Sequence, residues 1–315
     1  MAFPAAPFHA SVSYGPESGA ACWATCEDGV RIRFAAWPRP GARGTVLIFP
    51  GRTEYVEKYG QVAAALAQRG LASMAVDWRG QGLSDRLAKD PMIGHVEHFA
   101  DYQRDVKMML SWARERNMPQ PLFLLAHSMG GAIGLRALME KLPVAAASFS
   151  GPMWGISMAP HVRPAAWFLG KVMPRLGRGE ELPPGTKIEH HILADGFKDN
   201  LLTRDPEQFE IMRQQLLQHP DLVLGGPSFI WLREALTETR KLSHLSSPDV
   251  PCITFLGSNE RIVDTGVIRR RMESWPKGSL EIVPDGEHEV LMESRAKIEP
   301  LFDRIVARFL EPIAA

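Results

Sequence analysis

Six short apolar runs, each ended by turn-forming residues, recur along the chain. Four of the six show no alternation of apolar and polar positions, which is typical of strands buried on both faces of a mainly parallel sheet. We therefore predict strands near residues 45–49, 71–76, 121–126, 144–149, 252–256 and 280–283.

Helical patterns lie between these predicted strands. The spacing of apolar residues predicts a helix over 55–69, with Gly70 as its C-terminal stop, and further helices over 101–117 and 130–141. A last helix is predicted near the end of the chain, because apolar residues at helical spacing would form one face of it. These residues are Ile298, Leu301, Phe302, Ile305, Val306 and Phe309.

A hairpin is predicted near the N-terminus, before this alternation begins. Segments 20–27 and 30–37 alternate apolar and polar residues around Asp28-Gly29, a dipeptide that favours a tight turn. Strands that alternate with helices predict an α/β fold with a doubly wound, mainly parallel sheet.

The alternation stops after Pro152, and no convincing strand follows until about Ser247. A structureless loop of that length is implausible in a compact domain, so we predict a helical insertion above the sheet. The chain would then consist of a first core part over 1–151, a helical cap over 152–247, and a second core part over 248–315. Aromatic residues are frequent in the cap and include Trp154, Trp167, Phe168, Phe197, Phe209, Phe229 and Trp231.

The amino-acid composition limits the classes of protein to which this chain could belong. Hydrophobic residues make up 45% and charged residues 23% of the 315 residues, which are ordinary values for a globular chain. The 36 Lys and Arg residues are balanced by 36 Asp and Glu residues. We therefore do not expect the protein to bind nucleic acid through a net positive charge. No apolar run is long enough to span a bilayer, and the N-terminus does not resemble a signal peptide. Three cysteines are too few for a disulfide framework. We expect a cytoplasmic protein.

The strongest chemical signal is the run Ala126-His127-Ser128-Met129-Gly130. Ser128 lies where a buried strand ends and a helix begins, with small residues two positions before and after it. A nucleophile elbow requires this spacing, because larger side chains would collide with neighbouring backbone at so tight a turn. Ser128 is therefore the candidate nucleophile.

A serine needs a base and an orienting acid to react, and in this fold both should follow late strands. His288 follows the predicted strand 280–283, and His244 is the nearest histidine before it. We predict that His288 is the base. Glu260 and Asp264 both follow strand 252–256, and either carboxylate could hold the imidazole; we favour Glu260 and keep Asp264 as the alternative.

Backbone N–H groups should stabilise the negative charge that develops on the substrate. The fold predicts one donor directly after the nucleophile, at Met129, and one in the loop after strand 45–49, at Arg52. The Arg52 side chain has two interpretations. It could contact a phosphate or carboxylate of the substrate, or it could form an ion pair with Glu54 or Glu57.

These motifs together resemble α/β-hydrolases of the bacterial lysophospholipase type, which are similar to the monoacylglycerol lipases. The resemblance covers nearly the whole chain and rests on Pro50-Gly51-Arg52, Asp77–Ser84, Gly94-His95-Val96, Ala126–Gly131, Gly225-Gly226-Pro227 and Glu260–Asp264. It implies an α/β-hydrolase fold, hydrolysis of a single acyl ester on a glycerol backbone, and no metal or cofactor. Pro50-Gly51 and Glu260 depart from the His-Gly and Asp usual in monoacylglycerol lipases, which weakens the monoglyceride assignment.

The predicted cap would suit a lipid substrate, because an acyl chain binds best where apolar side chains cover it. Candidate substrate contacts there are Trp154, Trp167, Phe168 and Phe229. Segment 161–187 mixes apolar and basic residues, so it is either an interfacial helix that touches anionic lipid or a cap helix packed on the core. No metal site is expected, because neither His190-His191 nor the pair His95 and His98 has partners at a recognisable ligand spacing.

Three functions remain open from the sequence. The first is an acyl-ester hydrolase acting on lysophospholipid or monoacylglycerol. The second is an esterase or thioesterase for small soluble substrates. The third is a non-catalytic binding protein with the same fold. The only feature that favours it is Glu260, which stands where an Asp is usual. The oligomeric state is not evident from the sequence.

Overall fold

The computed structural model describes residues 3–311 and is built on one nine-stranded sheet. The strand order is β1-β2-β3-β5-β4-β6-β7-β8-β9. Pairs from β1 to β5 along this order are antiparallel, and all later pairs are parallel. The strands are β1 (Ala5–Ala6), β2 (Ala20–Thr25), β3 (Arg31–Trp37), β4 (Thr45–Phe49), β5 (Ala72–Asp77), β6 (Leu122–His127), β7 (Ala147–Ser150), β8 (Cys252–Gly257) and β9 (Gly278–Val283).

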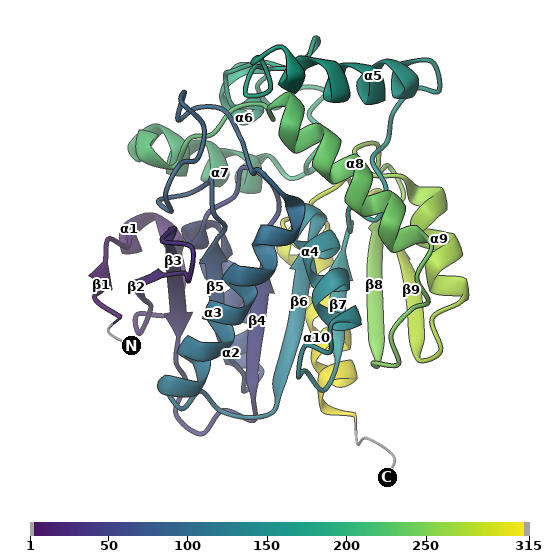
Figure 1. Cartoon of the computed structure of the whole chain (residues 1–315). Helices are drawn as coiled ribbons and strands as arrows, with labels where there is room; N and C mark the ends of the chain where they lie inside the picture. The colour runs from purple at the N-terminus through teal and green to yellow at the C-terminus, as the bar shows by residue number, and fades with distance from the viewer. Residues whose placement is uncertain (1–2, 312–315) are drawn as a thin grey trace.

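Helices cover both faces of this sheet, as Figure 1 shows. One face packs against α3 (Tyr102–Glu115), α4 (Ser128–Met139) and α9 (Thr265–Glu273), and the other against α2 (Gly60–Gln68) and α10 (Arg295–Leu310). The strands between them are buried on both sides: every residue of β4, β5, β6, β7 and β8 is buried. The prediction of a doubly wound, mainly parallel sheet with an N-terminal hairpin is confirmed.

Several boundaries and elements differ from the sequence-based prediction; among them, α2 begins at Gly60 rather than 55 and β9 at Gly278 rather than 280. β7 begins at Ala147 rather than 144, because residues 141–146 turn the chain back after α4, with Lys141 in the left-handed region at φ 65°. α4 begins at Ser128 itself rather than 130. β1 and α9 were not predicted, since β1 has two residues and only three side chains of α9 are buried.

Between β7 and β8 the described chain forms helices above the carboxyl ends of the strands (Figure 1). They are α5 (Val162–Arg175), α6 (His191–Ala194), α7 (Pro206–Gln218), the 3-10 turn η3 (Pro220–Leu222) and α8 (Phe229–Ser243). Two more 3-10 turns, η1 (Val56–Tyr59) and η2 (Phe99–Asp101), precede α2 and α3. Among the described residues, no helix is both long and apolar enough to cross a bilayer.

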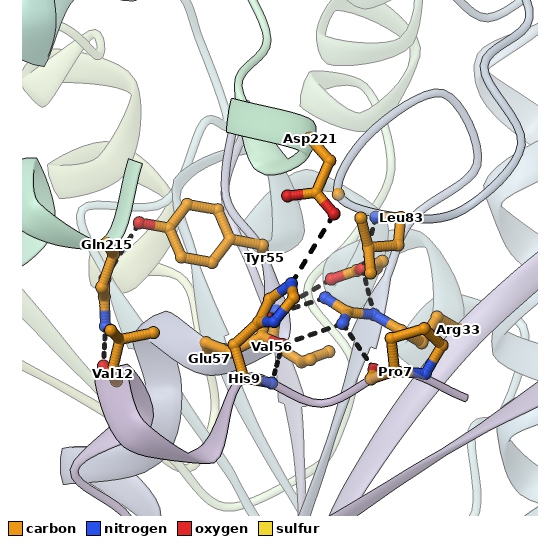
Figure 2. Close-up of polar contacts among 12 residues, drawn as sticks. Pro7, His9, Val12, Arg33, Tyr55, Val56, Glu57, Leu83, Gln215 and Asp221 are labelled. Atoms are coloured by element: carbon orange, nitrogen blue, oxygen red, sulfur yellow. Dashed lines mark hydrogen bonds and ion pairs between the residues drawn. The ribbon is translucent and has the colours of Figure 1, made fainter. Parts of the chain in front are cut away.

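The N-terminal segment around α1 (Ala10–Ser13) ties α7 and η3 to the core, as Figure 2 shows. The Gln215 side chain of α7 accepts a hydrogen bond from the Tyr55 hydroxyl at 2.9 Å and donates one to the Val12 carbonyl at 2.7 Å. Beneath it, Arg33 donates two hydrogen bonds of 2.8 Å to the Glu57 carboxylate. The His9 backbone N–H also donates to Glu57. Residues far apart in sequence thereby hold one side of the helical layer in place.

Candidate active site

Ser128 lies at a strained turn between β6 and α4. Its φ is +48°, a left-handed conformation that non-glycine residues rarely adopt and that typifies functional turns. Gly130 allows α4 to approach β4 closely: a Cβ there would lie 2.1 Å from the Phe49 carbonyl oxygen. The small residue two positions after Ser128 is therefore required by the backbone of the neighbouring strand.

His288 and Glu260 are joined by a short hydrogen bond, in which His288 Nδ1 lies 2.6 Å from Glu260 Oε2. Both side chains are almost fully buried. The other Glu260 oxygen accepts hydrogen bonds from the backbone N–H of Ile262 at 2.7 Å and Val263 at 3.2 Å. Because the carboxylate can only accept, Nδ1 carries a proton and Nε2 is left free to act as a base.

The environment favours the ionised form of Glu260. Burial alone would raise the pKa of this carboxyl, but the hydrogen bond from His288, the attraction to its ring when protonated and the two backbone N–H donors lower its pKa below the usual value. Asp264 has a different task. Its side chain caps the N-terminus of α9 by accepting from the Val267 N–H at 3.1 Å. Arg261 pairs with Glu287 rather than with Glu260.

Ser128 and His288 both line one cavity of about 680 Å³, whose other walls include residues from the helical segment between β7 and β8. In the described part of the chain the Ser128 hydroxyl makes no hydrogen bond to the His288 ring, and such contacts are often long before substrate binds. The ring of His127, the residue before Ser128, lies 4.7 Å from the ring of His288, centroid to centroid. About half of the other lining side chains are apolar, among them Met153, Ile156, Leu201, Leu202, Phe209, Trp231, Leu232, Ile262 and Val263.

The loop after β4 is held by hydrogen bonds that leave the Arg52 N–H available to a ligand. Glu54 accepts a hydrogen bond from the Gly51 N–H, and Gln81 donates to the carbonyls of Gly51 and Glu54. Within residues 3–311, the backbone N–H of Arg52 donates to no protein acceptor. The N–H of Met129 is in the first turn of α4, where helices leave their donors unpaired.

A buried cluster of charges under this loop was not predicted from the sequence. The Lys58 ammonium lies 2.6 Å from a Glu54 oxygen and 2.5 Å from a Glu289 oxygen. The second Glu289 oxygen lies 3.3 Å from His127 Nε2. These four side chains come from η1, β6 and the two loops that carry Arg52 and His288, so the cluster joins the segments that form the site.

Both ring nitrogens of His127 face acceptors in this cluster, which favours the protonated ring. Its Nδ1 lies 2.9 Å from the Ser150 carbonyl oxygen and its Nε2 faces carboxylates, and both of these partners can only accept. Burial would lower the pKa of His127, but Glu289 and Glu54 raise it above its usual value of 6.5. Burial likewise would raise the pKa of Glu289, but His127 and Lys58 hold it well below its usual value. When His127 is protonated, two cations balance two carboxylates in this cluster.

Two groups of side chains are close enough to share a metal ion. Glu54, His127 and Glu289 form one, but the Lys58 ammonium already lies between the two carboxylates. The other joins His9, His219 and the exposed Asp221. The His9 and His219 rings stack at 3.6 Å with an interplanar angle of 15°, so their in-plane lone pairs do not converge on one point. Neither group was predicted, and neither arrangement suits a metal.

The aromatic residues proposed as substrate contacts lie outside the cavity. Trp154 is in the core, where its N–H donates to the Gly131 carbonyl and its ring stacks on Trp275. Phe168 projects from α5 and is 63% exposed, whereas Phe229 is buried at the start of α8. Trp167, also on α5, does not line the cavity either. Phe209 and Trp231 line it instead, and no sequence signal distinguishes them from the other cap aromatics.

Comparisons with known proteins agree on one family. The family model Hydrolase_4, described as serine aminopeptidase S33, matches residues 40–295. Lysophospholipase L2 of Escherichia coli strain K12 is 31% identical over 283 residues, which cover 85% of this chain and 81% of that protein. The monoglyceride lipase of Saccharomyces cerevisiae is 28% identical over 286 residues, covering 86% of this chain and 87% of that protein.

Solved structures show the same fold at lower sequence identity. A soluble variant of the Saccharomyces cerevisiae monoglyceride lipase, in complex with a substrate analogue, superposes with a TM-score of 0.71 at 20% identity. The match covers 93% of this chain and 95% of that one. A thermostable carboxyl esterase from Bacillus coagulans, in complex with glycerol, gives a TM-score of 0.72 at 13% identity, covering 92% and 97% of the two chains.

Proposed function

The chain belongs to the Hydrolase_4 family and has the α/β-hydrolase fold, and we propose that it cleaves the single acyl ester of a lysophospholipid or monoacylglycerol with Ser128, His288 and Glu260. It is a carboxylic ester hydrolase of the lysophospholipase and monoglyceride lipase type. The observation that carries the residue assignment is the 2.6 Å hydrogen bond between His288 and Glu260, in a cavity that is also lined by Ser128.

In this proposal the reaction has two halves. His288 Nε2 takes the Ser128 proton as the hydroxyl oxygen attacks the ester carbonyl carbon, and Glu260 stabilises the imidazolium that forms. The N–H groups of Arg52 and Met129 hold the oxyanion, and removing one such donor typically raises the barrier by about 2.7–4 kcal/mol. The imidazolium then gives its proton to the departing glycerol oxygen. Water, deprotonated by the same histidine, releases the fatty acid and restores Ser128.

The cavity supports a substrate with one acyl chain. Its volume of about 680 Å³ is within the usual range for a site that takes a single small molecule, and most of the surface that lines it is apolar. We propose that residues 152–247 act as the cap that encloses the acyl chain. Leu201 and Leu202 support this role, because they line the cavity while their carbonyls accept hydrogen bonds from the backbone N–H groups of His288 and Glu289.

The test is hydrolysis by the purified protein of a panel of lysophospholipids, monoacylglycerols and p-nitrophenyl esters of increasing acyl length. We expect activity that rises with acyl length, and a loss of about 10³-fold or more in kcat for Ser128→Ala and for His288→Ala. A preference for the shortest esters would favour an esterase or thioesterase for small substrates. No hydrolysis of any ester, together with no labelling by a fluorophosphonate, would favour a non-catalytic binding protein.

We also propose that the protein is cytoplasmic and contacts the inner face of the membrane through α5. Support comes from apolar side chains that face solvent on this segment, Phe168 at 63% exposed and Leu176 at 65%, beside exposed Lys171 and Arg175. Such a mixture suits the boundary of an anionic bilayer. The three cysteines are buried free thiols, which suits a reducing compartment.

Sedimentation with vesicles tests the membrane contact. We expect the protein to bind vesicles rich in anionic lipid at low salt and to be released by high salt, and we expect Phe168→Asp with Leu176→Asp to abolish binding. The matched control is Leu217→Asp, which changes another exposed leucine on α7. Absence of binding by the unchanged protein at low salt would rule out this contact.

A further inference from the structure

Arg52 places a positive charge in the cavity that no protein carboxylate neutralises. Its guanidinium donates to the Gly225 carbonyl at 2.8 Å and lies 5.7 Å from the Trp231 ring centroid. Among residues 3–311, no carboxylate lies within ion-pair distance of it. Burial lowers the pKa of Arg52 to about 10, so the group remains charged at neutral pH without a counter-ion. A desolvated cation of this kind is costly unless a ligand supplies the opposite charge.

The acidic groups that could have neutralised Arg52 are paired elsewhere. Glu54 holds Lys58 at 2.6 Å, and Glu57 holds Arg33 at 2.8 Å. Asp195, which also lines the cavity, pairs with Lys187 at 2.7 Å. The remaining acid of the cap lining, Asp199, is exposed and makes no ion pair within the described residues. Of the two interpretations of the Arg52 side chain, the ion pair with Glu54 or Glu57 is therefore wrong.

The Arg52 side chain has about the same covalent length as the glycerophosphate part of a lysophospholipid. The terminal nitrogens of an arginine are about seven bonds from its backbone nitrogen. In a lysophospholipid the phosphorus is about six bonds from the ester carbonyl carbon. A substrate whose carbonyl oxygen contacts the Arg52 N–H can thus place its phosphate beside the guanidinium of the same residue, while the acyl chain extends among the apolar side chains.

On this basis we propose that the Arg52 guanidinium binds the phosphodiester of the substrate and selects lysophospholipids over monoacylglycerols. This inference rests on the proposed ester hydrolysis and adds a specificity determinant to it. The planar guanidinium can donate two parallel hydrogen bonds to a phosphate, and its bond to Gly225 fixes it in place beforehand. A monoacylglycerol has only a hydroxyl at that position and leaves the cation without a partner.

The test compares kcat/KM for a lysophosphatidylcholine and a monoacylglycerol of the same short acyl chain, both below their aggregation concentrations so that no lipid surface is present. For Arg52→Met we expect the ratio of the two values to fall by about 10- to 100-fold, the effect of removing a hydrogen bond to a charged group. For Arg52→Lys, which keeps the charge without the planar fork, we expect an intermediate ratio. Glycerophosphocholine should inhibit the unchanged protein competitively and Arg52→Met about 10-fold less.

The use of a ratio separates this proposal from the catalytic one. If a substitution displaces the Arg52 backbone N–H, kcat/KM falls for both substrates together and the ratio of the two values is unchanged. Arg213→Met removes an equal charge from the outer part of α7 and should keep the ratio of the unchanged protein. Equal losses on both substrates in Arg52→Met and Arg52→Lys would overturn the proposal while ester hydrolysis stands. A protein that hydrolyses neither substrate would contradict the proposed function itself.

Discussion

At the scale of single residues, Glu260 and Asp264 show how position decides the task of a carboxylate. Both follow β8 within a few residues, yet one carboxylate faces His288 and the other caps α9. We predict that Glu260→Ala lowers kcat by about 10²- to 10⁴-fold, because the imidazole loses the group that orients it. Steady-state kinetics on a monoacylglycerol or lysophospholipid measures this.

Asp264→Ala is the matched control. It should cost about 1 kcal/mol in the free energy of unfolding through the lost helix cap, with kcat changed by less than about threefold. If Glu260→Ala kept full activity while Asp264→Ala lost it, the acid would be Asp264.

His127 gives the stability of the protein a defined dependence on pH. The folded state raises the pKa of His127 above 6.5, so its stabilising effect is complete below pH 6.5 and is lost as the pH rises through the raised value. We predict that the urea midpoint of the unchanged protein falls over this alkaline range, and that His127→Gln shows a smaller fall. Equal slopes for the two proteins would contradict a protonated His127.

Some residues of the site could be identified from the sequence because they follow strand ends directly. Ser128, Glu260 and His288 lie within a few residues of an apolar run, and the structure brings the last two into contact. The charge cluster could not be identified in this way, because Lys58 and Glu289 are 231 positions apart and meet only in the folded chain. The prediction of which aromatic residues between β7 and β8 contact the substrate was wrong for a related reason. Packing in the folded chain decides which of these side chains face the cavity.

At the scale of elements, the contact between α4 and β4 fixes the elbow. A Cβ at position 130 would lie 2.1 Å from the Phe49 carbonyl and 2.5 Å from that of Pro50, just before the loop that carries Arg52. We predict that Gly130→Ala destabilises the protein by about 1–3 kcal/mol and lowers kcat by at least about 100-fold, because the helix must move away from that loop. Thermal unfolding and steady-state kinetics measure the two effects.

Gly266→Ala is the control, since a Cβ there meets only the ends of the Arg270 and Asp264 side chains. It should be neutral or slightly stabilising within α9. If Gly130→Ala were as well tolerated as Gly266→Ala, the close approach of α4 to β4 would not be needed for catalysis.

Elements of the core could be predicted because buried strands and amphipathic helices leave different patterns of apolar residues. β4, β5, β6 and β8 were predicted to within one residue at each end. The helical layer between β7 and β8 was predicted only as a helical region. Its helices contact the core through apolar side chains such as Trp231 and Leu242 and also through polar ones such as Gln215, and a hydrophobic pattern does not reveal the polar contacts.

At the scale of the whole molecule, one buried glutamine links three parts of the chain. Gln215 joins α7 to Tyr55 of the core and to Val12 of the N-terminal segment (Figure 2). We predict that Gln215→Leu costs about 2–4 kcal/mol, because two buried groups lose their partner. Hydrogen exchange should become faster in α7 and in residues 8–13.

The control is Gln218→Leu, which changes an exposed glutamine of the same helix and should leave both stability and exchange close to those of the unchanged protein. Unchanged exchange in Gln215→Leu would mean that the N-terminal segment does not hold α7 in place.

The most direct test of the account is to find which side chain a fluorophosphonate modifies, by mass spectrometry of the digested protein. The account predicts a single adduct on Ser128, formed quickly in the unchanged protein, much more slowly in His288→Ala, and absent in Ser128→Ala. An adduct on another residue, or equal labelling of Ser128→Ala, would contradict the claim that the strained turn after β6 carries the nucleophile.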